Sequence, residues 1–446
     1  MVVPRPSASA AAIVMCLLAG CSFEGMRGTS DSGQINVQVA VGSGQIVELA
    51  SGRMRIFTTG PLGEVLSDQS VADFLGCGQA NTARVRFDRS ESKWYMAAAE
   101  RTPVPRICFA VSSASSALSS WYRYTFNTEA GTYPNFSNLG FSTDKVGITY
   151  QRLQEVSGQG PPAGIFLIVF PKTNLPWGGP LAVTTFLFDG LLLAPGTTLT
   201  PSGGDQQADP TLYLAGMGGN NLRLWRVVGG NPAVLLSAIN VPIVYNEVTP
   251  DAPQLNSIDL LRTPGGVRDV VVRNSTIYVS GTSACIPAGD TALRTCLRLV
   301  EFTRLPGEVY SPGNDIEFGI PGQYVFFPAL ALDADRALVV GFGASGPTMY
   351  PQLMVTGRRT TDQLNTLKTP TVIHPGQAAY TNGDAVVDVL EWGRYYGAAT
   401  AGADERTSFV AGAYAPFAVY PTASPPPPPR PAQYATRVQK ILDALF

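Results

Sequence analysis

The chain contains one histidine, His374, which precedes Pro375 in an expected loop. A single histidine builds neither a histidine-rich metal site nor a catalytic Cys–His pair with its supporting ligands. Residues 343–346, GASG, fall one residue short of the G-x-S-x-G turn of serine hydrolases. The sequence also has no phosphate-binding glycine loop, dinucleotide-binding pattern or C-x-x-C-H motif. It therefore predicts no catalytic residue, no metal ligand and no cofactor.

Two aspartates alternate in the stretch DADRA. Asp333 and Asp335 have a spacing that suits calcium, which prefers several oxygen ligands in a tight loop. Aspartate is also common in hairpin turns, because its carboxylate accepts hydrogen bonds from nearby backbone N–H groups. We prefer this second, structural interpretation.

The stretch EWGRYY groups aromatic rings around one arginine. Its candidate binding residues are Trp392, Arg394, Tyr395 and Tyr396. Such rings supply a stacking platform in carbohydrate or peptide binders, and they equally serve as packing residues inside a fold. The sequence leaves both readings open and favours packing.

The N-terminus carries an export signal. One charged residue, Arg5, precedes an apolar stretch at residues 10–18 that is too short to span a bilayer. Residues 18–21, LAGC, resemble the lipobox of bacterial lipoproteins, in which the cysteine is acylated and becomes the mature N-terminus. The resemblance implies a signal peptide at residues 1–20 and a membrane anchor at Cys21. Ser22 in place of aspartate favours the outer membrane, with its periplasmic or surface face left open; a plain cleaved signal peptide is the alternative.

Four further cysteines lie in the body of the chain. In an oxidising compartment they favour two disulfides, for which the sequence alone allows three pairings. We expect the pairs that are nearest in the sequence, Cys77 with Cys108 and Cys285 with Cys296.

The composition fits an exported body made of short strands. The chain has 31 Lys and Arg against 33 Asp and Glu, so nothing in its charge predicts binding of nucleic acid. Its 46 glycines and 36 prolines fit many turns better than long helices.

Similar strand–turn–strand units recur along the chain. Residues 211–226 and 276–301 both pair a Thr-apolar-Tyr-apolar-small-Gly strand with a Leu-Arg-Leu strand, and Cys285 and Cys296 flank the longer turn of the second copy. Further units occur at residues 93–112, 164–188, 337–356 and 407–413. Such units over residues 34–421 predict an all-β fold, a β-propeller of six to eight four-stranded blades with seven favoured. Two stacked sandwiches are the alternative.

Several characteristic runs occur in a fixed order within residues 36–419, among them VAVGSGQIVELASGRMRIF, RVRFDRSESKWYMAAAE and EWGRYYGAATAGADERTSFVAGAYA. In this order they resemble a family of exported bacterial sialidase-like β-propeller proteins. The resemblance implies a propeller and a secreted or surface location, and it brings no defined reaction.

The sequence departs from this family pattern at two positions. Relatives usually carry an acid after Trp-Gly in the last blade, where Arg394 stands, and an acid before an early Arg-Val pair, where Thr82 and Ala83 precede Arg84. An arginine cannot replace a carboxylate as an oxygen ligand. The S-x-D-x-G-x-T-W turns of true sialidases are also missing.

The C-terminus changes character. Residues 424–431, SPPPPPRP, predict an extended linker within residues 422–432. In residues 433–446, Val438, Ile441, Leu442 and Leu445 have helical spacing, which predicts a short amphipathic helix, with a frayed tail as the alternative. Residues 21–33 are expected to form a flexible tether.

Together these features favour a lipid-anchored, non-enzymatic binding or scaffold module of the cell envelope. Its partners would be the membrane, through Cys21, and a protein or carbohydrate ligand at a propeller face. A sialidase-like glycoside hydrolase is the alternative.

Overall fold

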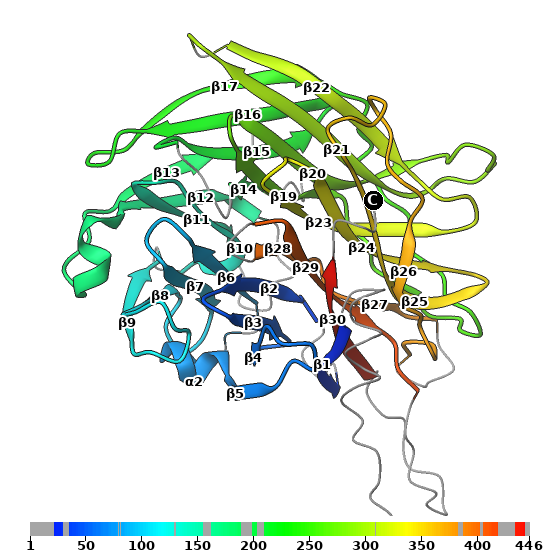
Figure 1. Ribbon diagram of the computed structural model, residues 1–446, viewed down its shortest axis with the longest axis horizontal. Helices are drawn as coiled ribbons and strands as arrows, with labels where there is room; N and C mark the ends of the chain where they lie inside the picture. The colour runs from blue at the N-terminus through cyan, green and yellow to red at the C-terminus, as the bar shows by residue number, and fades with distance from the viewer. Residues whose placement is uncertain are drawn as a thin grey trace, which may run out of the picture.

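The computed structural model describes residues 22–29, 35–78, 80, 82–128, 131–154, 162–188, 199–202, 209–307, 309–381, 387–401, 405–417 and 433–441. Its strands form seven antiparallel sheets of four strands, arranged around a central axis as a seven-bladed β-propeller (Figure 1). The predicted all-β propeller is therefore confirmed. The expected signal peptide, Cys21 and the proline-rich linker lie outside the described residues.

Blades 1 to 6 each consist of four strands that follow one another in the chain, from the inner edge of the blade to the outer edge. Blade 1 has β2 (Gln38–Gly42), β3 (Gln45–Ala50), β4 (Arg53–Thr58) and β5 (Val65–Ser70). Blade 2 has β6 (Ala83–Asp88), β7 (Lys93–Glu100), β8 (Arg106–Ser112) and β9 (Trp121–Asn127). Blade 3 has β10 (Tyr133–Phe141), β11 (Lys145–Leu153), β12 (Pro162–Pro171) and β13 (Thr184–Phe188).

Blades 4 to 6 repeat the pattern. Blade 4 has β14 (Thr200–Pro201), β15 (Leu212–Gly218), β16 (Asn221–Val228) and β17 (Val234–Pro242). Blade 5 has β19 (Gly266–Arg273), β20 (Thr276–Cys285), β21 (Arg294–Leu305) and β22 (Val309–Phe318). Blade 6 has β23 (Tyr324–Leu332), β24 (Leu338–Gly346), β25 (Met349–Arg358) and β26 (Thr371–His374). The two similar sequence units are the middle strands of blades 4 and 5.

Blade 7 joins the two ends of the chain. Its strands, from the inner edge outward, are β28 (Gly397–Ala401), β29 (Thr407–Tyr414), β30 (Gln433–Ile441) and β1 (Ser22–Thr29). The strand β30 pairs with β29 on one side and with β1 on the other. The propeller is thus closed by strands from opposite ends of the sequence.

This closure corrects two expectations. Residues 433–441 form a strand instead of a helix, and residues 22–29 form a strand instead of a flexible tether. Val438 and Ile441, which have helical spacing, are both buried in the strand, because β30 is covered on both faces. A lone helix of under four turns is marginal, whereas β29 and β1 offer β30 hydrogen-bond partners along both edges.

Helix is scarce in the described ranges. A five-residue helix α2 (Val71–Leu75) connects blades 1 and 2, and a 3-10 helix η1 (Lys172–Trp177) follows β12. Within these ranges, no helix has the length and hydropathy needed to cross a membrane.

Burial follows position in the blade. The second strand of blade 5, β20, is buried along its whole length, whereas only Asn314 and Ile316 are buried in the outermost strand β22. Apolar clusters fill the spaces between adjacent blades. The innermost strand of each blade contacts the innermost strands of its two neighbours, so the ring is continuous.

The two faces of the propeller differ in their connections. Because neighbouring strands run in opposite directions, the first-to-second and third-to-fourth turns of every blade lie on the same face, which we call the hairpin face. The opposite face carries the connections between blades. Two of these are long, residues 243–265 and 375–396, and they are joined by the short parallel pair β18 (Leu260–Leu261) and β27 (Val389–Leu390).

A buried carboxyl group lies under the closing strands. Glu48 on β3 is inaccessible to solvent and packs beside Thr436 of β30. A β-carbon at Gly25 of β1 would overlap both side chains, so only glycine fits over this pair. Burial raises the pKa of Glu48 to about 7, with partial opposition from Thr436 and Arg55.

We expect Glu48 to make blade closure sensitive to pH. A carboxyl whose folded-state pKa is raised from 4.5 to about 7 binds more protons in the folded state, so the free energy of unfolding falls as pH rises from about 4.5 to 7. Once Glu48 is ionised, the carboxylate of Asp68 repels it, and the guanidinium of Arg55 partly offsets this repulsion. At pH 8, Glu48→Gln should therefore be more stable than the wild type by up to about 3 kcal/mol.

Unfolding midpoints measured at pH 4.5 and pH 8 would check this expectation. The exposed Glu64→Gln is the matched control and should keep the wild-type pH profile. An identical pH dependence in Glu48→Gln and the wild type would contradict the assignment.

Candidate functional site

The centre of the propeller is closed by an ion pair between opposite blades. Arg86 on β6 of blade 2 donates to the carboxylate of Asp269 on β19 of blade 5 at 2.9 Å, and both side chains are nearly buried. Asp269 also accepts a hydrogen bond from the backbone N–H of Leu330 in blade 6 at 3.1 Å. We call the two ends of the central axis, one on each side of this ion pair, the mouths of the propeller.

The mouth opposite the hairpin face is rich in arginine, and we call it the arginine mouth. It contains Arg84, Arg101, Arg268 and Arg394 together with Tyr395. The guanidinium carbon of Arg84 lies 3.5 Å from the centre of the Tyr395 ring, and that of Arg268 lies 5.8 Å away. Arg394 is close enough to repel both Arg101 and Arg268. Cations from blades 2, 5 and 7 therefore converge around one aromatic ring.

The local backbone fixes these side chains. Arg84 and Arg268 stand near the start of the innermost strands β6 and β19. Arg84 shares one side of β6 with Arg86, two residues further on, whereas Arg268 lies at a register shift of β19 between Val267 and Asp269. Arg394 follows Gly393, which has φ +116° and lies so close to the backbone of Asn36 that a β-carbon would approach its N atom to 2.9 Å. Asn36 then accepts a hydrogen bond from the N–H of Arg394 at 2.8 Å.

The electrostatics of this mouth favour an anion. Burial lowers the pKa of Arg84 and of Arg268 to about 10, so both remain charged at neutral pH. Nε and Nη2 of Arg84, and Nε of Arg268 and Arg394, are buried and find no hydrogen-bond acceptor in the part of the chain that the structure describes. Arg268 donates through Nη2 to the backbone carbonyl of Pro264 and, at 2.7 Å, to that of Gly265. The buried N–H groups without acceptors are therefore mainly those of Arg84, and an anion that accepts their hydrogen bonds removes the cost of burying them.

The structure divides the four aromatic-cluster residues between two environments. Trp392 and Tyr396 are buried core residues; the indole N–H of Trp392 donates to the Tyr396 hydroxyl at 3.0 Å, and that hydroxyl donates to the carbonyl of Ala413 at 3.1 Å. These two residues therefore form no surface stacking platform. Arg394 and Tyr395 instead belong to the arginine mouth.

Sequence reasoning missed most of this mouth. Arg84, Arg101 and Arg268 come from distant segments, and a signal existed only for the first, since Arg84 and Arg86 share one side of the strand RVRF. The two positions that depart from the resembled family pattern are neighbours in space: Asn36 contacts the Arg394 N–H on one side and the Thr82 hydroxyl at 3.4 Å on the other.

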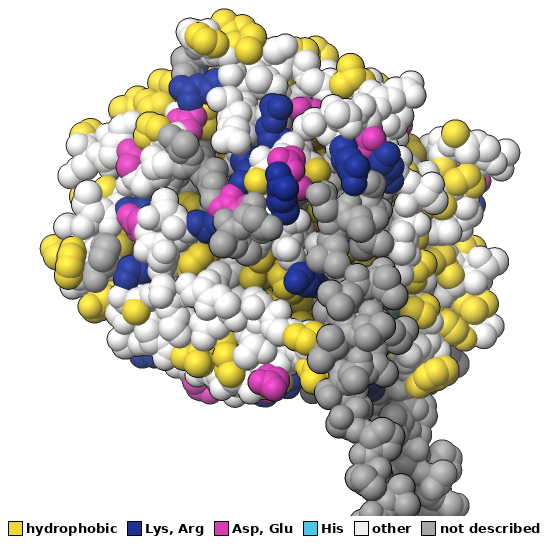
Figure 2. All heavy atoms as spheres, in the orientation of Figure 1, with side chains coloured by type: hydrophobic (Ala, Val, Ile, Leu, Met, Phe, Trp, Pro, Cys, Tyr) yellow, Lys and Arg dark blue, Asp and Glu magenta, His cyan; other side chains and the backbone are white. Residues whose placement is uncertain are grey.

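The hairpin mouth has a different character. Arg273 of blade 5 pairs with Glu405 of blade 7, and Arg89 of blade 2 lies 3.9 Å from the same carboxylate. Next to it, a cavity of about 430 Å³ opens between blades 1, 2 and 7, with Arg89 and Lys440 in its lining. This mouth therefore mixes both charge signs. Basic and acidic side chains are also interleaved near the centre of the face seen in Figure 2.

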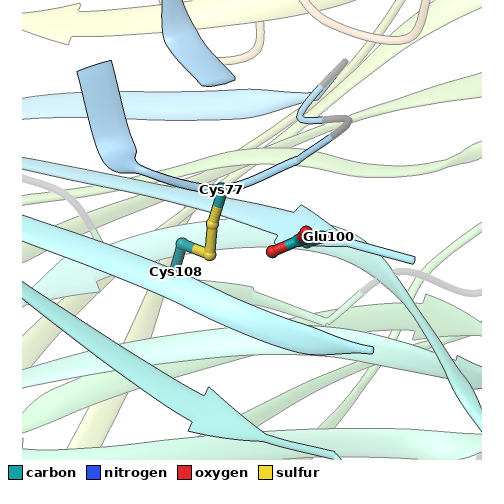
Figure 3. A group of neighbouring side chains, drawn as sticks. All are labelled: Cys77, Glu100 and Cys108. Atoms are coloured by element: carbon teal, nitrogen blue, oxygen red, sulfur yellow. A yellow bond between two sulfur atoms is a disulfide. The ribbon is translucent and has the colours of Figure 1, made fainter. Parts of the chain in front are cut away.

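Both predicted cysteine pairs are disulfides in the structure, Cys77 with Cys108 and Cys285 with Cys296. The carboxylate of Glu100 points toward the first pair, and the three side chains form a cluster with the composition of a metal site (Figure 3). The two sulfur atoms are bonded to each other, however, and Glu100 is paired with Arg106 at 2.5 Å. The cluster is therefore a structural disulfide with a neighbouring ion pair.

The remaining candidates have structural surroundings. The His374 ring stacks on Tyr414 with centroids 3.9 Å apart, and burial lowers its pKa. Asp333 accepts a hydrogen bond from the backbone N–H of Ala337 at 2.7 Å inside a hairpin turn, and exposed Asp335 pairs with Arg406. These contacts match the structural interpretation of the DADRA turn.

The comparisons with known proteins leave the family open. No protein-family model and no curated protein matches the sequence. Similar solved structures include the Pseudomonas aeruginosa periplasmic gluconolactonase PpgL, with 10% identity, 80% of this chain and 86% of that chain covered, and a TM-score of 0.44. The phage phi92 endosialidase has 9% identity, coverages of 81% and 72%, and a TM-score of 0.42. The six-bladed Aleuria aurantia lectin has 11% identity, coverages of 75% and 95%, and a TM-score of 0.40.

TM-scores this low carry no argument about function. The assignment to the class of seven-bladed β-propellers rests on the seven sheets themselves.

Proposed function

We propose that this protein is a lipid-anchored binding module of the bacterial cell envelope, whose arginine mouth holds a carboxylate-bearing carbohydrate. The observation that carries the proposal is the buried guanidinium of Arg84, with two N–H groups that lack acceptors among the described residues. The planar fork of an arginine matches the two oxygens of a carboxylate. The Tyr395 ring, which is itself buried, packs against this guanidinium and holds it in place.

The described charges at this mouth support binding over catalysis. Glycoside hydrolysis needs two carboxyl groups, or a tyrosine nucleophile with a carboxylate partner. The described titratable groups that interact with Arg84 and Arg268 are tyrosines, other arginines and Asp269, which is already paired with Arg86. These groups are therefore sufficient to bind an anion, but they include no unpaired carboxyl group that could act as the acid of a hydrolase.

Glycan-array binding of the folded mature chain tests the proposal. We expect signals on glycans that end in sialic acid or uronic acid, and none on their neutral or methyl-esterified counterparts. Equal binding to the acidic and esterified forms would overturn the arginine mouth as the site.

A sialidase-like hydrolase is the second candidate, favoured by the contact between Tyr395 and Arg84, since sialidases use a tyrosine as nucleophile. Fluorogenic sialosides distinguish the two functions. We expect no turnover with or without calcium; turnover that disappears in Tyr395→Phe would establish the hydrolase.

The membrane anchor is proposed at Cys21, directly before the first residue of β1. A single acyl chain binds a bilayer only reversibly, whereas two or more chains anchor a protein stably. We expect Cys21→Ala to abolish incorporation of a palmitate analogue and to release the protein from the membrane fraction. Label that persists in Cys21→Ala would refute the anchor.

A further inference from the structure

The chain enters the propeller at the hairpin face. Ser22, the first residue of β1, pairs with Gln439, and Arg437 donates to the Ser22 hydroxyl at 2.6 Å. The residue after Gln439, Lys440, lines the cavity formed with the first-to-second turns of blades 1, 2 and 7. Residue 21 is therefore one peptide bond away from a fixed point on the hairpin face.

The same face carries exposed apolar residues in each of the six remaining blades, blades 1 to 6. Each of blades 1 to 6 has at least one large hydrophobic side chain, between 42% and 81% exposed, in or directly beside its third-to-fourth turn. In order along the ring they are Leu62 and Val65, Leu118, Trp177 and Val183, Val234, Leu305 and Val309, and Leu364. In Figure 2 hydrophobic side chains are spread around the rim of the face in view.

Single exposed hydrophobic residues are normal on protein surfaces. The opposite face also has exposed apolar residues, among them Val244, Val248 and Phe417. The hairpin face differs because its exposed apolar residues recur at one structural position in six blades. The seventh blade has the start of β1 at that position, because β30 and β1 are its third and fourth strands. Tryptophan and leucine on one rim are typical of surfaces that rest in the interfacial layer of a bilayer.

We infer that the hairpin face rests on the bilayer that holds the acyl chains of Cys21, and that the arginine mouth points away from the membrane. The inference deepens the proposed function and depends on its anchor. The acylated cysteine places one edge of the face at the lipid surface, and the apolar turns of the other blades contact the interfacial layer. The ligand then reaches the arginine mouth from the aqueous side.

Trp177 allows a direct test, because it is 81% exposed and the other four tryptophans are buried or partly buried. The acylated full-length protein is reconstituted in phosphatidylcholine vesicles with and without brominated acyl chains, which quench nearby indoles. We expect the brominated lipid to remove the Trp177 component of the emission, and Trp177→Phe to lose this response.

Paired variants locate the contact. Leu118→Asp with Leu364→Asp on the hairpin face should weaken the quenching, whereas Val244→Asp with Val248→Asp on the opposite face should leave it unchanged. Acylation is read separately by the palmitate label. An acylated protein whose Trp177 is not quenched would overturn the orientation and leave the anchor intact, while a protein that takes up no label would overturn both.

Discussion

A chain restricted to residues 34–421 will not fold into a closed propeller. It lacks β1 and β30, which are two of the four strands of blade 7, and it leaves the β29 edge unpaired. Met26, Tyr434, Val438 and Ile441 leave the core with these strands. Each such side chain contributes about 1.5–3 kcal/mol by burial, and the sum approaches the roughly 5–15 kcal/mol that stabilises a typical domain.

We expect residues 22–446 to give one cooperative thermal transition and residues 34–421 to aggregate or to unfold without cooperativity. The sequence analysis ends the propeller at residue 421, so this experiment also tests whether residues 433–441 and 22–29 are strands of the propeller. A truncated protein with the wild-type transition would contradict the closure by β1 and β30.

A point variant separates this effect from truncation. Val438→Asp places a charge in the fully buried middle of β30, and we expect a loss of several kcal/mol in the free energy of unfolding. Val372→Asp on the outermost strand of blade 6, where the valine is 43% exposed, is the matched control and should stay within about 0.5 kcal/mol of wild type. Equal effects of the two variants would argue against β30 as a core strand.

The second large effect concerns the arginine mouth. Replacing Arg84 or Arg268 by methionine keeps the buried volume and removes the charge, so the affinity for glucuronate or N-acetylneuraminate should fall about 10- to 100-fold, the range expected for a lost hydrogen bond to a charged group. Arg84→Lys keeps the charge without the planar fork, so its affinity should lie between those of the wild type and Arg84→Met. The exposed Arg53→Met is the control and should bind as wild type.

The pH dependence of this binding follows from the same arginines. Because burial lowers the pKa of Arg84 and Arg268 only to about 10, both are protonated throughout pH 6 to 8, and the affinity should be flat there. It should decline as the pH approaches 10, where the guanidinium groups begin to lose their protons. Calorimetric titrations at pH 6, 8 and 10 measure this profile, and a steep fall between pH 6 and 8 would point to a different group.

The sequence determined the local architecture. Alternating apolar residues and the similar strand pairs of blades 4 and 5 predict the hairpin units. Such a prediction is possible because the period-two alternation of a strand is visible within a few consecutive residues. The disulfide pairs follow from short separations in the chain, 31 and 11 residues. These features depend on neighbours in the sequence, so they could be predicted without the fold.

Tertiary structure decided the closure and the site. The spacing of Val438 and Ile441 fits a helix and a doubly buried strand equally well, and only the open position between β29 and β1 selects the strand. Likewise, Trp392 and Tyr395 are close in the sequence, yet one packs in the core and the other meets Arg84 and Arg268. The ring brings blades 2, 5 and 7 to one axis, and no local pattern encodes contacts between residues so far apart in the chain.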